Sequence, residues 1–458
     1  MKKMIKMSLA AAMLMGISSV SAQATEIMTN VKVKGEIRAR FENVDTGRGG
    51  IAADDYTSKN DANAITNRFV IGVGADLFGT DWLSTYVEMT DVHALNNNYN
   101  STNNGGGSAY NPYIAPNTKK NNVVADPEQT RVTQAYIDVK MGNTLLRAGR
   151  QMINLDNQRF VGAVGWRQMP QTYDGFLLAN SDITNLNLAA AYLTKVNTIK
   201  ADDARALETR AVVLHAQYKV ADFLTVTAYD YMLGAGTGDN TGTNNAVGSD
   251  TIGLALTGKP KLGDAVTLNY RAEYAVMVDP SLDTDQWSGG NNNNDNYDAD
   301  YYNLEVGVNV SGFLAQLGYE VQSGTADSYT GKDNKTFSTP LGTNHKFSGW
   351  ADVFLGTPDQ GLEDLNLMLG YKSKDFGTFK VVYHDFQSEV DGINYGQEFD
   401  AVYVRAIPGV KGLKGLVKYA QYEGDDKQIH AWDSSKNNPK AEDVQKFWFM
   451  LDYKFASN

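Results

Sequence analysis

The stretch VKVKGEIRARFE, residues 31–42, alternates between apolar or small residues and charged residues without a break. Successive side chains of a β-strand point to opposite faces, so one face of this strand carries only charged side chains. Such a strand fits a transmembrane β-barrel with lipid outside and water inside. Turning its basic residues toward lipid would cost about 2–4 kcal/mol each near the bilayer midplane. The pattern therefore predicts four basic residues that face the lumen, where they line the channel or have a structural role in pairs with carboxylates of the next strands: Lys32, Lys34, Arg38 and Arg40.

A secretory signal peptide is expected before this strand. Three lysines among the first six residues precede an apolar run, residues 7–20, and the small residues Ala22 and Ala24 follow it. The run is too short for a membrane-spanning helix. We therefore expect a signal peptide over residues 1–22, with cleavage at Ala24 as the alternative, and a single barrel domain over residues 25–458.

The composition also favours a barrel. The 458 residues include no Cys, 43 Gly and 25 Tyr. Abundant Tyr suits the aromatic girdles of a barrel at the lipid headgroups. After the signal peptide no apolar run is long enough for a transmembrane helix, so a barrel is the only spanning structure left.

The charge of the chain argues against nucleic acid as a partner. The formal net charge is −12, and loss of the three leader lysines from the 41 basic residues leaves 38 against 53 acidic ones, or −15. A nucleic-acid-binding surface is basic. The acidic excess lies largely in Asn-, Asp- and Gly-rich stretches, which are typical of solvated loops.

No catalytic or metal site is predicted. An enzyme on a barrel would need a Ser/His or Asp/His constellation at its rim, and the sequence spacing indicates none. The histidines form no HExxH motif and no i, i+4 pair. We therefore expect no enzymatic activity, no metal and no cofactor. The five histidines are His93, His215, His345, His384 and His430.

Alternating segments recur along the chain, joined by connections that are short, then long, then short. Bacterial barrels have short periplasmic turns, long outer loops and an even number of strands. A candidate strand at residues 346–354 would make the number odd, so we place residues 336–364 in an outer loop that can fold inward. This predicts an all-β, transmembrane, antiparallel barrel of about 18 strands, with both termini periplasmic and an aqueous lumen.

The most distinctive stretch is GRQMINLDNQRFVGAVGWRQMPQTYDG, residues 149–175. In a regular strand Arg147 and Arg150 would fall on opposite faces, so either the strand ends near Gly149 or a bulge intervenes. One hypothesis is an inward-folded loop whose arginines narrow the lumen and bind carboxylates in a bidentate way. The alternative, a solvated loop with local ion pairs, is equally compatible with the residues.

This stretch and a second one, TPLGTNHKFSGWADVFLGTPDQGLEDL at residues 339–365, resemble the alginate-export family of outer-membrane porins. The resemblance implies an 18-stranded, monomeric barrel with a basic pore for anionic polysaccharide or smaller polar solutes. Three residues follow Phe455, so the barrel assembly machinery must tolerate a short tail. The motif suggests four candidate pore residues, Arg150, Arg159, Arg167 and Asp174, which Arg147 and Arg271 on predicted strands join.

A group of acidic residues flanks an Asn-rich run and could bind calcium through hard oxygen ligands. Its spacing fits no EF-hand, so a solvated outer loop is the favoured interpretation. The residues are Asp279, Asp283, Asp285, Asp295, Asp298 and Asp300.

The leading functional hypothesis is a channel in the outer membrane of a Gram-negative bacterium for passive diffusion of small polar, anionic solutes. One alternative is export of an anionic polysaccharide such as alginate. A second is an adhesive or structural role of the acidic outer loops, which would need no open lumen. The expected partners are outer-membrane lipid, the solutes and the barrel assembly machinery.

Overall fold

The computed structural model describes residues 27–47, 61–99, 121–200, 207–234, 248–282, 297–324, 336–390, 392–425 and 442–457. The predicted signal peptide lies outside these residues, as do Asp283, Asp285 and Asp295 of the acidic group and His430. Within the described ranges, no helix combines the length and apolar character that a membrane crossing requires.

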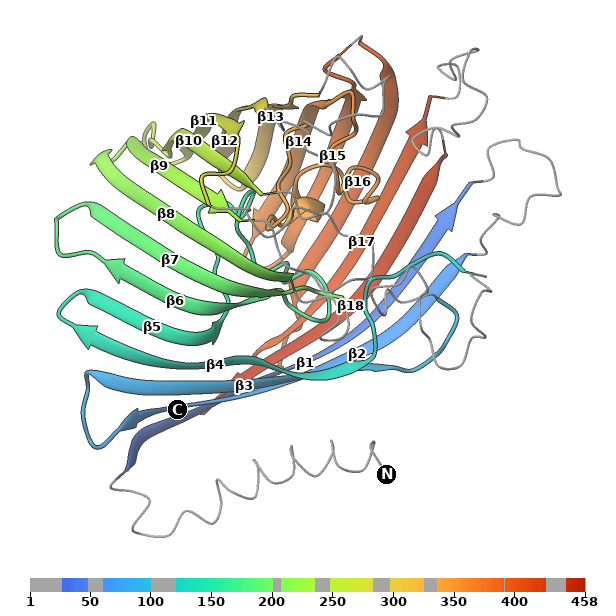
Figure 1. The fold of residues 1–458 in the computed structure, drawn as a ribbon. Coiled ribbons are helices and arrows are strands. Elements are labelled where there is room, and N and C mark those ends of the chain that lie inside the picture. The colour runs from blue at the N-terminus through green and yellow to red at the C-terminus, as the bar shows by residue number, and fades with distance from the viewer. Residues whose placement is uncertain are drawn as a thin grey trace, which may run out of the picture.

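The chain forms one closed antiparallel sheet of 18 strands (Figure 1), which confirms the predicted fold class. Each strand pairs with its neighbours in sequence, and β1 pairs with both β2 and β18 to close the barrel. The strands are β1 Met28–Thr46, β2 Ala62–Leu77, β3 Leu83–Ala94, β4 Gln129–Met141, β5 Thr144–Gln151, β6 Thr172–Asn180, β7 Leu186–Asn197, β8 Leu207–Ala221, β9 Leu224–Leu233, β10 Ser249–Gly258, β11 Val266–Val278, β12 Asp298–Val310, β13 Phe313–Gln322, β14 Leu362–Ser373, β15 Gly377–Gln387, β16 Asn394–Ala406, β17 Leu413–Gly424 and β18 Val444–Ala456.

The alternation in β1 determines which face points inward. Ile37 is 40% exposed on the outside of the barrel, whereas Arg38 is 7% exposed on the inside. Arg38 lies opposite Arg68 of β2 and Asp452 of β18, so charged residues of three strands meet on one face. Because a side chain and its direct cross-strand partners point the same way, the inward face of β1 fixes the inward face of its neighbours.

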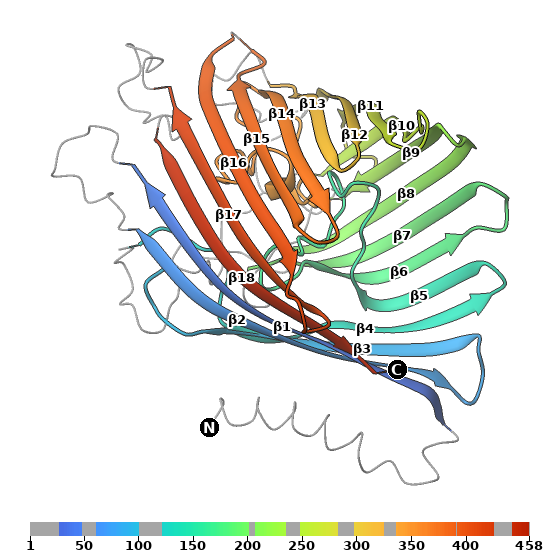
Figure 2. The ribbon, with the colours of Figure 1, turned by 180° about the vertical axis from the view of Figure 1, so that it is seen from behind.

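Short and long connections lie at opposite ends of the barrel (Figure 2). Met28 at the start of β1 pairs with Leu77, beside the short turn to β3. At the other edge of β1, Lys34 pairs with Ala456 near the end of the chain. The described ends of the first and last strands therefore lie at the short-turn end, which we assign to the periplasm.

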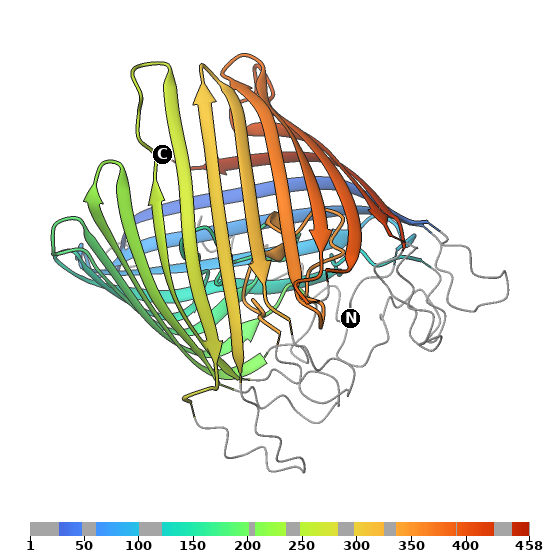
Figure 3. The same ribbon diagram turned by 90° about the horizontal axis from the view of Figure 1, so that it is seen from above.

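Three segments between strands fold into the barrel (Figure 3). We call residues 152–171 inner segment 1, residues 336–361 inner segment 2 and residues 121–128 inner segment 3. Apolar side chains of each pack on the wall: Phe160 and Val161 of inner segment 1, Phe337 and Phe354 of inner segment 2, and Val124 of inner segment 3. The barrel interior thus has its own apolar core.

Inner segment 2 corresponds to the predicted outer loop and is not a strand of the wall. It contains a single 3₁₀ turn, η4 (Asn344–Lys346), and Ala351 in it is only 2% exposed. The predicted end of the loop at residue 364 is wrong by three residues. Leu362 pairs with Gln322 and Asp364 with Glu320, so the ladder to β13 already begins at Leu362.

The face assignment gives a direct prediction for β12. Val306 is 59% exposed on the outer side, and its neighbour Glu305 lies on the lumen side and accepts a hydrogen bond from Gln316. Val306→Arg should reduce folding stability by about 2–4 kcal/mol more than Glu305→Arg, because only the first places a guanidinium in lipid. Urea titrations of both variants in lipid vesicles measure the difference. Equal losses would mean that the faces are assigned wrongly.

Candidate functional site: the charged interior of the barrel

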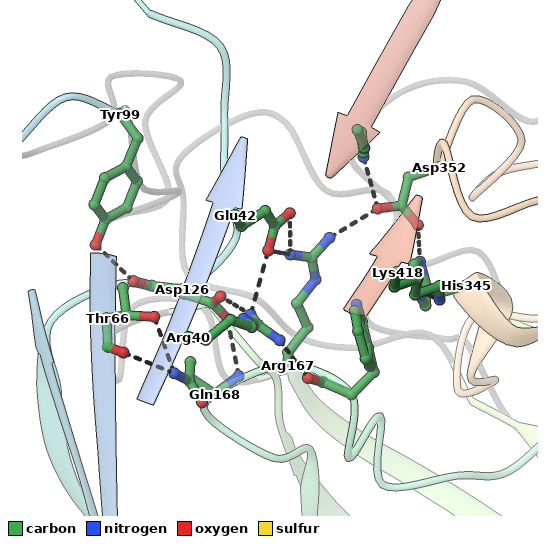
Figure 4. Close-up of polar contacts among 12 residues, drawn as sticks. Arg40, Glu42, Thr66, Tyr99, Asp126, Arg167, Gln168, His345, Asp352 and Lys418 are labelled. Carbon is green, nitrogen blue, oxygen red and sulfur yellow. Dashed lines mark hydrogen bonds and ion pairs between the residues drawn. The ribbon is translucent and has the colours of Figure 1, made fainter. Parts of the chain in front are cut away.

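Arg40 of β1 binds inner segments 1 and 3 at the same time (Figure 4). Its guanidinium forms a buried ion pair with Asp126 and donates a hydrogen bond to the carbonyl oxygen of Trp166 at 2.7 Å. The other oxygen of Asp126 accepts the backbone N–H of Gln168 at 2.8 Å. Gln168 in turn donates to the hydroxyl of Thr66 on β2 at 2.9 Å. A charged residue of the wall therefore organises both segments.

Arg167 of inner segment 1 joins the wall to inner segment 2. Its guanidinium lies 3.1 and 3.2 Å from the two carboxylate oxygens of Glu42 on β1 and 2.8 Å from Asp352. All three side chains are buried. Burial alone would lower the pKa of Arg167, but the two carboxylates hold it above its ordinary value. Arg167 therefore stays charged and neutralises both carboxylates.

Asp352 and His345 of inner segment 2 continue the network toward β17 and β18. Lys446 donates to Asp352 at 2.8 Å, and Lys418 lies 2.7 Å from Nε2 of His345. An ammonium group can only donate, so Nε2 accepts and the Nδ1–H group donates to Asp352. Burial would raise the pKa of Asp352, but the hydrogen bond from His345 and the ammonium of Lys446 hold it well below its usual range.

His345 is neutral in this arrangement. Burial, with the nearby Lys418 ammonium, lowers its pKa to about 3 despite the attraction of Asp352. The ring stacks on Trp166 of inner segment 1 with centroids 4.9 Å apart. Because the pKa of a free imidazole is about 6.5, acidification below that value favours release of His345 from this site.

Lys418 occupies a cage of three tryptophan rings. Its Nζ atom lies 3.8 Å from the ring centroid of Trp350, 4.2 Å from that of Trp166 and 5.2 Å from that of Trp448. The faces of aromatic rings attract cations, most strongly where water is excluded. Since one ring comes from each of two inner segments and one from the wall, Lys418 helps to hold both segments in place.

Arg159 holds inner segments 1 and 2 together at a second place on the wall, beside β13. It is 1% exposed, pairs with Glu320 of β13 at 2.6 Å, and donates to Thr339 and Asn344 of inner segment 2. Burial would lower its pKa, but Glu320 and Tyr301 raise it above its ordinary value. Beside it, Asp156 of inner segment 1 pairs with Arg271 of β11, which also contacts Glu273 at 2.7 Å.

The structure therefore places Arg38, Arg40, Arg159, Arg167 and Arg271 inside the barrel. Each lies within ion-pair distance of at least one carboxylate. Arg159 and Arg167 come from the same sequence motif, but they bind different strands of the wall: Arg159 pairs with Glu320 of β13 and Arg167 with Glu42 of β1. The essential partners, Asp126 and Asp352, carry no sequence pattern that marks them, because an ion pair between distant loops leaves no periodic signal.

The expectation that Arg150 and Asp174 line the pore is corrected by the structure. Their neighbours Gln151 and Tyr173 are fully buried on the inner side, so the alternation of β5 and β6 places Arg150 and Asp174 on the outer side of the wall. There they form a bidentate ion pair at 2.7 and 2.9 Å. β5 continues through Gly149 to Gln151 and pairs with β4 and β6 without a register shift, so the expected strand end or bulge near Gly149 is wrong.

Arg147 of β5 points inward near the short-turn end and makes a bidentate pair with Asp138 of β4 at 2.7 and 2.8 Å. Lys32 and Lys34 of β1 lie inward at the same end and are exposed. The Nζ atom of Lys34 lies 4.5 Å from the ring centroid of Tyr86, an inward residue of β3. The exposed inward cations are thus lysines near the short turns.

Two further inward lysines at this end are exposed but paired: Lys454 of β18 with Glu36 and Lys219 of β8 with Asp222. Three others are also exposed, alternate with outward apolar residues and, among the described residues, make no ion pair within 4.0 Å. They are Lys140 of β4, Lys372 of β14 and Lys414 of β17. Within the same described ranges, no group of three or more His, Asp and Glu residues is arranged to hold a metal ion.

Barrels with the same fold are found among solved outer-membrane proteins. OccAB2 of Acinetobacter baumannii superposes with a TM-score of 0.65 at 17% identity, over 94% of this chain and 100% of that one. OccK9 (OpdG) of Pseudomonas aeruginosa gives 0.64 at 15% identity, over 93% and 99%. OpdK of Pseudomonas aeruginosa, solved with vanillate, gives 0.64 at 13% identity, over 94% and 100%. These likenesses show the class of fold: a closed β-barrel like those of outer-membrane channels.

A match of the sequence to a family profile identifies the family. The profile of the family described as "Alginate export" matches residues 30–422, most of the chain. The protein therefore belongs to the alginate export family, which confirms the resemblance carried by the two long motifs. No curated protein sequence matches it significantly.

The network predicts the behaviour of a cysteine introduced at Ala351, in a chain that has no other cysteine. In the native barrel Ala351→Cys should react slowly with a water-soluble maleimide, because the residue is buried within inner segment 2. Adding Arg167→Gln removes this partner from two buried carboxylates. The free energy of unfolding should then fall by about 3–5 kcal/mol. The labelling rate should then rise at least about tenfold.

Arg147→Gln is the matched control, since it also breaks an inward arginine pair but far from inner segment 2. It should leave the labelling rate of the introduced cysteine unchanged. Equal rates with and without Arg167 would refute the role of this ion pair. Quenching of a label at residue 351 by lipid-borne quenchers would instead place it in the wall and require a new strand count.

Proposed function

We propose that this barrel is an outer-membrane channel for passive diffusion of small anionic solutes and has no enzymatic activity. The proposal rests on one observation: among the described residues, the exposed inward cations without a carboxylate partner are lysines at the short-turn end. The buried arginines are matched by carboxylates and offer no free charge to a solute. We further propose that the barrel is a monomer that contacts outer-membrane lipid and the barrel assembly machinery.

The position of these lysines supports anion preference despite the net negative chain. Exposed charges on outer loops are screened beyond roughly 8 Å at physiological ionic strength. Charges inside a confined lumen act at shorter distance and lower effective dielectric, so they dominate once an ion has entered. Ammonium groups on flexible stems also suit weak, exchangeable contacts with a passing solute.

One of the comparisons supports a small carboxylate as solute. OpdK was solved with vanillate, an aromatic carboxylate, and it shares the barrel fold at 13% identity. The alternative, export of an anionic polysaccharide such as alginate, is favoured by the description of the family. The same lysines would contact either solute. A polysaccharide chain would need a wider path, and the inner segments would have to move to open it. Because buried ion pairs fix these segments, we favour the small solute.

Reversal potentials in a salt gradient test the proposal. The wild-type channel should prefer anions, including at high salt, where the outer loops are screened most. Lys372→Gln combined with Lys414→Gln should shift the reversal potential toward cations, because both side chains are exposed in the lumen. Arg405→Gln is the control: this exposed cation lies near the same end of the barrel but on the outward face of β16.

A wild-type channel that prefers cations at high salt would contradict the proposal and leave a weakly selective porin. Block of the chloride current by an added solute distinguishes a channel for small carboxylates from an exporter of polysaccharide. Millimolar benzoate should reduce the chloride current of the wild-type channel, and the double lysine variant should respond less. Block by alginate oligomers without block by benzoate would favour the exporter.

A further inference from the structure

Two aspartates lie on the outward face of the wall, where neighbouring residues face lipid. Asp230 of β9 is directly opposite Leu214 of β8 and Ile252 of β10, both of which are strongly exposed outside. Asp250 of β10 is opposite Met232 and Val278 on the same face. Asp230 and Asp250 are thus diagonal neighbours across the β9–β10 pair, with Cα atoms typically about 7–8 Å apart.

The inward residues between them confirm the orientation. Tyr231 of β9 and Thr251 of β10 pair with each other and are both buried on the lumen side. Asp230 and Asp250 alternate with these residues and therefore point outward. They lie near the long-loop end of their strands, and on the next two strands the outward rings of Tyr274 and Tyr302 pack 5.1 Å apart. Outward tyrosines of this kind mark the membrane interface.

Neither carboxylate is compensated by a cation of the described chain. Asp250 is only 6% exposed, yet among the described residues its Oδ1 atom has no hydrogen-bond donor and its Oδ2 atom accepts only the backbone N–H of Ser281, at 3.0 Å. The Oδ1 atom of Asp230 is also buried without a donor. Across the described ranges no ion pair includes either residue. Two adjacent carboxylates with buried oxygens repel one another and are costly unless something neutralises them.

We propose that Asp230 and Asp250 form a site for a divalent cation, calcium or magnesium, on the lipid-facing side of the barrel at its extracellular edge. Carboxylate oxygens are the ligands that these hard cations prefer, at about 2.0–2.6 Å. Side chains of diagonal neighbours can reach one ion between them, and water completes the coordination. The cation neutralises both carboxylates and ties β9 to β10. The two carboxylates face outward, whereas the lysines of the proposed solute path face the lumen.

The test uses the full barrel in neutral, phosphate-free detergent, with calcium chloride as the probe and sodium chloride of equal ionic strength as the reference. Calcium should raise the unfolding temperature of the wild type in a saturable way. Asp250→Asn should remove this response. Without calcium, Asp250→Asn should unfold at a higher temperature than the wild type, because the amide carries no charge to compensate. Asp230→Asn should behave in the same way.

Glu423→Gln is the matched control, since it neutralises an outward carboxylate of β17 that already accepts a hydrogen bond from Gln421. This variant should keep the full calcium response. The proposal is overturned if calcium leaves the wild type unchanged, which would indicate a protonated pair, or if Asp250→Asn responds to calcium like the wild type. Because both substitutions are nearly isosteric and remove charge from a lipid-facing surface, a failure to fold is itself contrary to the proposal.

Discussion

The ion pairs of Arg167 with Glu42 and Asp352 connect three parts of the chain that are far apart in sequence. Glu42 belongs to the wall, Arg167 to inner segment 1 and Asp352 to inner segment 2. Each charge is buried, so removal of any one weakens the compensation of the charges beside it. The charged face of β1 thus has two roles: it keeps the strand's other face toward lipid, and it provides the partners that fix the inner segments.

In this account the buried arginines hold the inner segments in place, and the exposed lysines contact the solute. A guanidinium has a planar fork that binds two carboxylates at once, so Arg167 is well suited to a buried junction. The ammonium groups of Lys372 and Lys414 are exposed near the short turns and remain available to ions. Net charge alone would not show this, because the acidic excess of the chain lies largely in its loops. Selectivity depends on which charges are left unpaired inside the barrel.

Much of the fold could be predicted from the sequence, because period-two alternation and turn residues are local signals. Residues 31–42 gave the strand and its faces, and residues 336–361 were correctly left out of the wall. The sides of Arg150 and Asp174 could not be predicted, since strand continuity through Gly149 depends on pairing with β4 and β6. The partners of Arg167 could not be predicted either. Contacts between distant loops arise only when the barrel closes, and they leave no periodic pattern in the sequence.

A double-mutant cycle on Arg167 and Asp352 tests the central claim most directly. The free energy of unfolding in urea is measured for the wild type, Arg167→Gln, Asp352→Asn and the double variant. If the two side chains form the junction, the double variant loses clearly less than the two single losses together, with a coupling of about 0.5–3 kcal/mol. Strictly additive losses would show that Arg167 and Asp352 do not interact, and the account of fixed inner segments would fail.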